Sequence, residues 1–144
     1  MRVEFLDYLQ VLKLDSSWRV LGPFRAMLLR SKDNELLRER IIAVPDGFET
    51  DFASVPRLPF VFLAAGDTAQ RAAVLHDYLY STGEHRAFAD SVFLAAMKAE
   101  QIPAWRRYLM WAGVRVFGGA YYRERDEREH AELEEVADNA NGRH

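Results

Sequence analysis

The chain has 144 residues, of which 49% are hydrophobic and 28% charged, and it carries a formal net charge of −3 and no cysteine. This length and composition are typical of one globular domain with its own hydrophobic core. The absence of cysteine excludes disulfides and thiolate metal sites. A slightly acidic chain also lacks the basic balance of a general nucleic-acid-binding protein, so we expect no nucleic-acid partner.

The N-terminal residues do not predict export. Glu4 interrupts the stretch in which a signal peptide needs an unbroken apolar core, and no apolar run in the chain is long enough to span a bilayer. We therefore expect the protein to stay in the cytoplasm of the cell that makes it.

The first 45 residues have the pattern of β-structure. Residues 3–5 begin with alternation, and residues 26–30 and 36–44 flank a polar cluster at 31–35 that suits a hairpin turn. The segment that follows, residues 48–63, contains two prolines three positions apart, which exclude a continuous helix there.

Beyond Gly66 the apolar spacing becomes helical. The pattern predicts three helices, from an N-cap at Asp67-Thr68 to Ser81, from Arg86 to Glu100, and from Ala104 to Phe117. Gly83 is expected to end the first helix, and Pro103 suits the first turn of the third. The predicted class is α+β, with an N-terminal antiparallel hairpin or sheet packed against a C-terminal three-helix unit. Residues 1–122 would form the domain, and residues 123–144 would form a charged, solvated tail, helical or frayed.

The third predicted helix combines aromatic and basic residues. Trp105, Tyr108 and Trp111 follow one helical face, and arginines are interleaved with them. This composition suits an interfacial helix on anionic lipid, and it also suits a core helix whose arginine side chains extend to solvent. The regular spacing of the aromatic residues favours the core.

The first two predicted helices carry the residues best suited to chemistry. His76 and Tyr80 are four positions apart and share a helix face, whereas Asp77 points about 100° away from His76. If the next helix returns antiparallel, Asp90 comes beside His76. A carboxylate bound to one imidazole nitrogen leaves the other nitrogen to act as a base. Asp77 is then available to bind a hard cation such as Ca²⁺ through oxygen.

Each of these residues also has a structural explanation. His76 and Asp77 can form hydrogen bonds with nearby backbone groups. Asp90 can lie in the first turn of its helix, where the helix dipole stabilises an acidic side chain. Tyr80 can be a core tyrosine with one hydrogen bond. His85 lies in a loop, where we expect it to be solvent-exposed or a spare ligand.

The irregular segment adds two further candidates. Asp51 is a candidate metal ligand, and Ser54 can donate a hydrogen bond to a substrate. Both can instead cap turns before the proline that follows.

The residues His76, Asp77, Tyr80 and Asp90 resemble the two-helix motif of secreted and bacterial phospholipases A2. That resemblance implies His76 as the general base that activates water, Asp90 as the residue that orients it, Tyr80 as support for Asp90, and Asp77 as a Ca²⁺ ligand. The cysteine positions of the motif are alanine and leucine here, as a chain without disulfides requires. The glycine-rich calcium loop of those enzymes has no counterpart in residues 61–66, which contain one glycine.

A second resemblance covers nearly the whole chain. Its motifs are residues 44–56, 72–80, 86–97, 105–107 and 114–118. They resemble a bacteriophage and prophage family catalogued as domain of unknown function 1353, which implies a phage origin but no particular reaction.

Taken together, these patterns predict a phage-encoded hydrolase with a His-Asp site, assisted by a cation and acting on acyl esters in the manner of phospholipase A2. The expected cation is Ca²⁺ rather than Zn²⁺, and the expected substrate is a lipid or another ester. The alternative is a non-catalytic component of the virion or of tail assembly, whose partners are other phage proteins.

Overall fold

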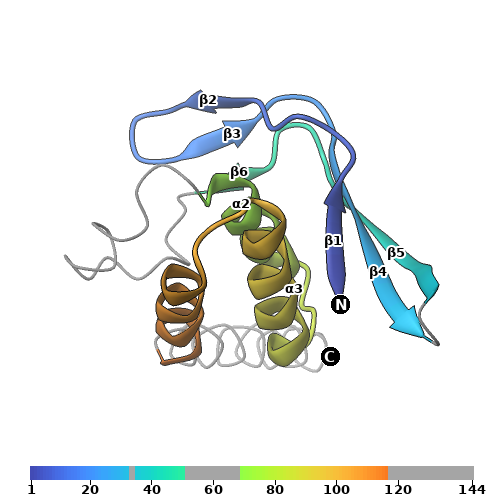
Figure 1. The fold of residues 1–144 in the computed structure, drawn as a ribbon. Helices are drawn as coiled ribbons and strands as arrows, with labels where there is room; N and C mark the ends of the chain where they lie inside the picture. The colour runs from blue at the N-terminus through green and yellow to red at the C-terminus, as the bar shows by residue number, and fades with distance from the viewer. Residues whose placement is uncertain (33–34, 51–68, 117–144) are drawn as a thin grey trace, which may run out of the picture.

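The computed structural model describes residues 1–32, 35–50 and 69–116. In these residues six strands precede the helices (Figure 1). The strands are β1 (Arg2–Phe5), β2 (Val11–Lys13), β3 (Trp18–Val20), β4 (Phe24–Lys32), β5 (Glu35–Val44) and β6 (Glu49–Thr50). The helices that follow are α2 (Gln70–Ser81) and α3 (Arg86–Ala99). A further helical segment covers residues 104–116. The predicted α+β class is confirmed.

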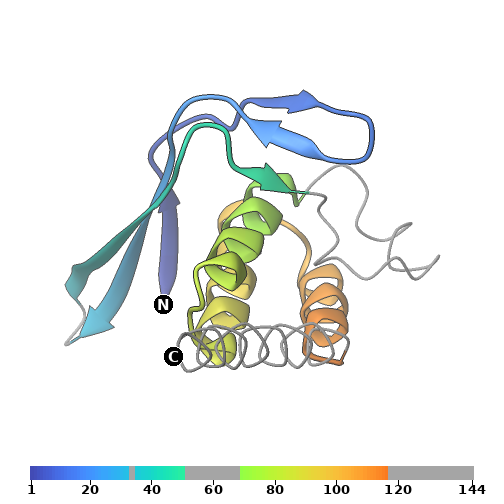
Figure 2. The same ribbon diagram turned by 180° about the vertical axis from the view of Figure 1, so that it is seen from behind.

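The strands form two small antiparallel sheets, with strand orders β1-β4-β5 and β2-β3-β6. The predicted hairpin is β4-β5, whose pairing runs from Phe24↔Val44 to Lys32↔Glu35 with a shift in register at Leu28/Leu29. Seen from both sides, the helices lie beside the first sheet, and the second sheet lies across one end of them (Figures 1 and 2). The second sheet was not expected from the sequence because its strands have only two or three residues each.

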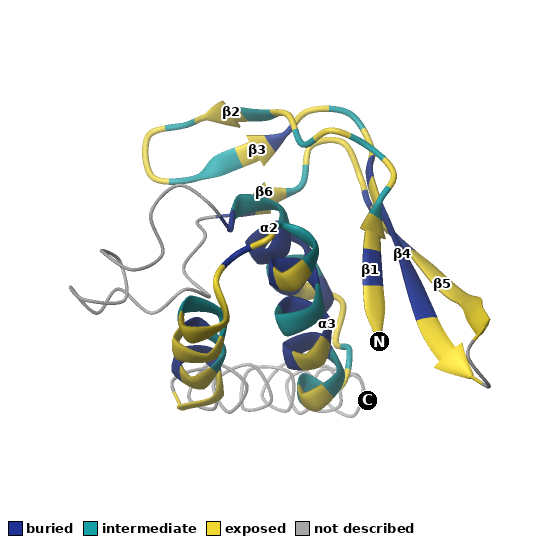
Figure 3. Ribbon diagram, in the orientation of Figure 1, coloured by how far each residue is buried: buried dark blue, intermediate teal, exposed yellow. Residues whose placement is uncertain are grey.

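The core lies between the first sheet and the two long helices (Figure 3). The sheet contributes alternate residues of each strand, because successive side chains point to opposite faces. The largest of the fully buried apolar side chains in this core are Phe24, Leu28, Leu75, Leu79, Phe93, Met97 and Met110. Full burial of one such side chain contributes about 1.5–3 kcal/mol, so this layer fixes how α2 and α3 face each other.

The C-terminal end of α2 lies where the sequence predicts it, whereas the N-terminal end does not. The helix ends at Ser81, and Gly83 has a φ of 77°, the left-handed conformation that glycine adopts readily. The predicted N-cap at Asp67-Thr68 is wrong: the N-cap is Ala69, with no side-chain hydrogen bond. Glu100, just beyond α3, instead accepts from the backbone N–H of residue 71 at 3.3 Å and of residue 72 at 3.1 Å. A carboxylate from a neighbouring helix thus satisfies the free N–H groups of α2.

The helical segment 104–116 turns a different face to the core than the aromatic spacing predicts. Met110 and Val114 are buried, while Trp105 and Tyr108 are 61% and 57% exposed. The inward stripe includes Met110 and Val114, four positions apart, and of the three predicted aromatic residues only Trp111 packs against the core, where it is partly buried. None of the helices in the described ranges combines the length and hydropathy needed to cross a bilayer. The predicted tail, residues 123–144, lies outside the described residues.

Candidate active site

The hairpin of α2 and α3 brings together three polar residues from two different helices, His76, Tyr80 and Asp90. His76 and Tyr80 lie one turn apart on α2, and Asp90 lies near the beginning of α3, which packs against α2. His76 Nε2 is 2.9 Å from Asp90 Oδ1, and the Tyr80 hydroxyl donates to the same oxygen at 2.7 Å. The antiparallel return therefore produces the contact between His76 and Asp90 that the spacing predicted.

This cluster is enclosed by apolar surroundings. His76 is 0% exposed, Asp90 1% and Tyr80 4%. The imidazole ring lies 4.0 Å from the Tyr80 ring and 4.9 Å from the Phe93 ring, measured between centroids. Polar groups in such surroundings are destabilising unless they are hydrogen-bonded, so each bond in the cluster matters more than it would at the surface.

Two arginines hold the other oxygen of Asp90. Arg115 Nη1 donates to Oδ2 at 3.3 Å, and Arg86 Nε lies 3.8 Å from the same oxygen, one turn earlier on α3. Arg86 also donates through Nη2 to the carbonyl oxygens of Val114, at 3.2 Å, and Arg115. Asp90 is thus bound from α2, from its own helix and from the helical segment 104–116.

These contacts determine the protonation of the cluster. Burial acts to raise the pKa of Asp90, but the hydrogen bonds from His76, Tyr80 and Arg115 outweigh it and hold this pKa below its ordinary value. Burial, and then the bond to Asp90, raise the pKa of Tyr80 far above neutrality. At neutral pH the cluster therefore contains an ionised carboxylate and a protonated phenol.

The ionised state of Asp90 determines the tautomer of His76. A carboxylate can only accept hydrogen bonds, so His76 Nε2 must be the nitrogen that carries the proton. In neutral imidazole the other nitrogen, Nδ1, then has a free lone pair. Nδ1 is buried, and it has no hydrogen-bond partner in the part of the chain that the structure describes. A buried nitrogen of this kind requires an explanation, and a catalytic role or an ordered water are two of the usual ones.

Asp77 lies outside this cluster. Its Oδ2 accepts a hydrogen bond from the Thr50 hydroxyl, which brings the end of β6 against α2. Both groups offer oxygen, the ligand type that Ca²⁺ prefers and Zn²⁺ uses less. Across residues 1–32, 35–50 and 69–116 there is no group of three or more histidine and acidic side chains arranged to hold a metal ion.

The remaining predicted residues do not join the cluster. His85 is the N-cap residue of α3, makes no side-chain cap bond and is exposed. Asp51 and Ser54 lie outside the described residues.

Sequence reasoning missed the two arginines. Arg86 carries a detectable signal, because it lies four positions before Asp90 and opposite charges at that spacing attract on a helix. Arg115 carries none, since it is 25 positions from Asp90 and reaches it only through tertiary packing.

A family described as "Protein of unknown function (DUF1353)" matches residues 26–114. The chain belongs to this family. The matched DUF1353 region contains most of β4, all of β5, β6, α2 and α3, and most of the helical segment 104–116, and with them His76, Tyr80 and Asp90; Arg115 lies one position beyond it. Neither a curated protein nor a solved structure matches the chain.

Proposed function

We propose that this DUF1353 protein is a hydrolase in which His76 is the general base. The observation that supports the proposal is the unequal environment of the two imidazole nitrogens. Nε2 is bound to an ionised carboxylate, whereas Nδ1 is buried and has no hydrogen-bond partner in the described residues. This is the arrangement required of a histidine that takes a proton from water.

The proposed reaction uses each member of the cluster. Nδ1 removes a proton from water as the water oxygen attacks an acyl carbon, and the positive charge that develops on the imidazole is stabilised by Asp90. Tyr80 and the arginines keep Asp90 ionised and in position. When the tetrahedral intermediate collapses, the imidazole returns its proton to the leaving oxygen, and an acid and an alcohol are released.

The proposed substrate class is an acyl ester, either a lipid or a smaller ester. This class comes from the resemblance of His76, Asp77, Tyr80 and Asp90 to the phospholipase A2 motif. Asp77, together with Asp51 from outside the described residues, would hold a Ca²⁺ ion, which would stabilise the oxyanion when bound.

The catalytic role is tested with a pair of glutamine variants. In His76→Gln the side-chain amide can still donate to Asp90, but no base remains, so the fold should persist and ester hydrolysis should fall by about 100-fold or more. His85→Gln is the matched control and should hydrolyse normally, because His85 is exposed and outside the cluster. Hydrolysis of nitrophenyl esters and of phospholipid vesicles is followed for both variants, and an active His76→Gln enzyme would exclude His76 as the base.

The tautomer provides a second test, independent of the substrate. Nitrogen NMR of labelled protein at neutral pH should show His76 protonated at Nε2 and unprotonated at Nδ1. His76 is 0% exposed, so a base at this position requires the site to open to water, and modification of His76 by diethylpyrocarbonate in the folded protein measures that opening. Protection of His76 from this reagent, at concentrations that modify His85, would contradict the proposal.

The cation is tested by thermal unfolding with Ca²⁺ and with Zn²⁺. An ion that binds only the folded state stabilises it by about 2.7 kcal/mol at 100 times its Kd. We expect Ca²⁺ to raise the Tm of the wild type and to leave that of Asp77→Asn unchanged. If neither ion raises the wild-type Tm, the cation-assisted form of the mechanism is wrong.

A second candidate function is a non-catalytic component of a phage particle or of its tail assembly, made in the host cytoplasm. The exposed apolar side chains of the helical segment 104–116 favour it: Trp105, Tyr108 and Val116 are 61%, 57% and 71% exposed, as in surfaces that bind partners. Such a component should self-assemble or bind other phage proteins, and His76→Gln should not affect that binding. Light scattering with the two glutamine variants separates the two functions.

A further inference from the structure

The outward face of the helical segment 104–116 is apolar. A helix on the surface of a globular protein normally buries one apolar stripe and exposes polar side chains on the opposite face. This segment buries Met110 and Val114 against the core, but its opposite face is not polar. The exposed residues of that face, which we name the outer stripe, are Trp105, Tyr108, Leu109, Ala112 and Val116. At about 100° per residue, these positions fall within an arc of about 100° of the helix surface.

Arginine side chains border the outer stripe on both sides. Helix geometry places Arg106 just beyond Leu109 and Arg115 just beyond Tyr108. Arg106 lies over the Trp105 ring, 5.3 Å from its centroid, and the Arg115 side chain is 44% exposed. The outer stripe is therefore an apolar ridge with a positive charge along each side.

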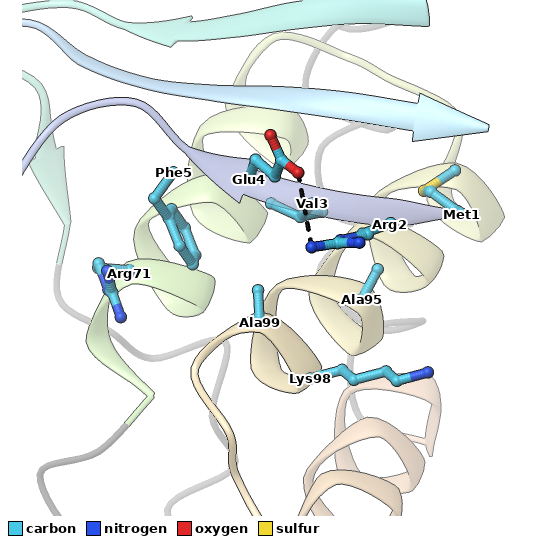
Figure 4. Close-up of a pocket in the computed structure, with 9 residues that line it drawn as sticks. All are labelled: Met1, Arg2, Val3, Glu4, Phe5, Arg71, Ala95, Lys98 and Ala99. Atoms are coloured by element: carbon cyan, nitrogen blue, oxygen red, sulfur yellow. Dashed lines mark ion pairs between the residues drawn. The ribbon is translucent and has the colours of Figure 1, made fainter. Parts of the chain in front are cut away.

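The exposed charges of α3 and of the helical segment 104–116 are all basic. Residues 86–116 contain two acidic side chains, Asp90 and Glu100, which are 1% and 5% exposed and already pair with arginine. Lys98 is exposed and lines a groove of 710 Å³ between β1 and α3 (Figure 4). The basic residues of this part of the chain are Arg86, Lys98, Arg106, Arg107 and Arg115. An acidic chain thus presents a locally basic surface beside the outer stripe.

This arrangement of charge indicates what the outer stripe fits. At the surface of an anionic bilayer, tryptophan and tyrosine lie at the boundary between headgroups and acyl chains, and arginine side chains extend to the phosphates. Lipid therefore supplies an apolar medium and negative charge on both sides of the ridge at once. A second copy of the chain would instead bring arginine against arginine, and like charges in contact oppose binding.

The sequence pattern of this helix suits either the core or a lipid surface. The core is excluded for most of its aromatic side chains, because Trp105 and Tyr108 are 61% and 57% exposed. We propose that the outer stripe binds the surface of an anionic phospholipid bilayer, with the helical segment 104–116 lying in the plane of the headgroups. This binding does not require hydrolysis, so it is independent of the role proposed for His76.

The experiment measures co-sedimentation of the full chain with phosphatidylglycerol vesicles. Phosphatidylcholine vesicles at the same lipid concentration are the matched control. We expect binding to the anionic vesicles to be about tenfold or more tighter, and to weaken as salt is added, because salt screens the attraction between arginine and phosphate. Tryptophan emission should shift to shorter wavelength on binding, since Trp105 leaves water. The variant His76→Gln should bind as the wild type does, so loss of hydrolysis and loss of binding are separate results.

Two pairs of variants localise the binding. Tyr108→Glu places a negative charge in the outer stripe and should weaken vesicle binding about tenfold or more. Tyr8→Glu makes the same change at a tyrosine that is 90% exposed outside this helix, and it should have no effect. Arg106→Gln should weaken binding about fivefold. Arg30→Gln removes the same charge from β4, where the side chain is 67% exposed, and should bind normally.

Three outcomes would overturn the proposal. The first is the absence of binding to phosphatidylglycerol vesicles, and the second is equal binding by Tyr108→Glu and the wild type. The third is a doubled mass in light scattering without lipid that Tyr108→Glu returns to the mass of one chain, since a second copy would then cover the outer stripe.

Discussion

In the described part of the chain, two aspartates are bound by arginine: Asp7, in the bend that follows β1, and Asp90, between the helices. Asp7 accepts from Arg25 through both oxygens, at 2.8 and 2.9 Å, and its side chain keeps 22% of its surface exposed. Asp90 accepts from Arg115 at 3.3 Å and also from His76 and Tyr80, and it is 1% exposed. The hydrogen bond from Arg25 lowers the pKa of Asp7, and the bonds around Asp90 lower its pKa against the opposing effect of burial.

The difference lies in what happens when a bond is broken. Water and ions can solvate Asp7 and Arg25 if they separate, so the pair contributes little although its geometry is better. Two partners of Asp90, His76 and Tyr80, are buried, so each would be left with an unsatisfied polar group, although Arg115 is 44% exposed and can be solvated. Hydrogen-bond geometry alone is therefore a poor measure of how much a contact contributes to the stability of this protein, and the burial of its partners is the better one.

Truncation of the two aspartates gives the largest expected effect. Asp90→Ala leaves His76 and Tyr80 unpaired in the core and should lower the free energy of unfolding by about 3–5 kcal/mol. Asp7→Ala should cost far less, because Arg25 becomes solvated. Urea unfolding followed by circular dichroism measures both, and losses of similar size would contradict the distinction between the two regions.

Removal of a single hydroxyl should have an intermediate effect. Tyr80→Phe keeps the ring that packs on His76 but removes one donor to the ionised Asp90, which we expect to cost about 1.5–3 kcal/mol. Tyr8→Phe is the matched control, because Tyr8 is 90% exposed and its hydroxyl is solvated. The same urea measurement applies, and a Tyr80→Phe protein as stable as the control would show that the hydroxyl does not support Asp90.

The smallest expected effect is on the pH dependence of stability, to which two buried carboxyl groups, Glu100 and Asp90, contribute in opposite directions. Burial raises the pKa of Glu100 in spite of its bonds to the α2 N-terminus and Arg71, whereas the pKa of Asp90 is lowered. A raised folded-state pKa means that the folded protein holds the proton more tightly, so the contribution of Glu100 to stability falls as pH rises above its unfolded pKa of about 4.3. Asp90 contributes stability above its unfolded pKa of about 3.9, and this contribution is lost as pH falls through the lower folded pKa.

The Tm measured against pH tests these signs. Relative to the wild type, Glu100→Gln should gain stability as pH rises from about 4.3. Asp90→Asn should be less stable than the wild type near neutral pH, and the difference in Tm should shrink as pH falls, because the wild type then loses the contribution of the ionised Asp90. Parallel curves for the wild type and Glu100→Gln would mean that Glu100 titrates normally in the folded protein.

Local patterns predicted the scaffold well. The polar cluster at residues 31–35 correctly indicated the β4-β5 turn, and Gly83 correctly marked the end of α2. These features depend on steric preferences within a few residues, which the sequence displays directly. The N-cap of α2 was wrong for the opposite reason, since the bonds come from Glu100, almost 30 positions away.

The candidate site shows the same division. The shared face of His76 and Tyr80 follows from helix geometry, and one assumed antiparallel return was enough to bring Asp90 beside them. Arg115 and the bond from Thr50 to Asp77 could not be predicted, because each joins elements whose relative position depends on packing. The exposed face of the helical segment 104–116 was misjudged because hydrophobic residues at helical spacing do not reveal which stripe faces the core.

The sequence by itself thus determined the α+β class, the hairpin, the C-terminal end of α2, the span of α3 and the trio His76, Tyr80 and Asp90, since all of these follow from spacing along the chain. Only the tertiary structure decided the protonation of Asp90 and Tyr80 and the arginines that hold Asp90. Those properties depend on burial and on distances between separate elements, and neither is a function of local sequence.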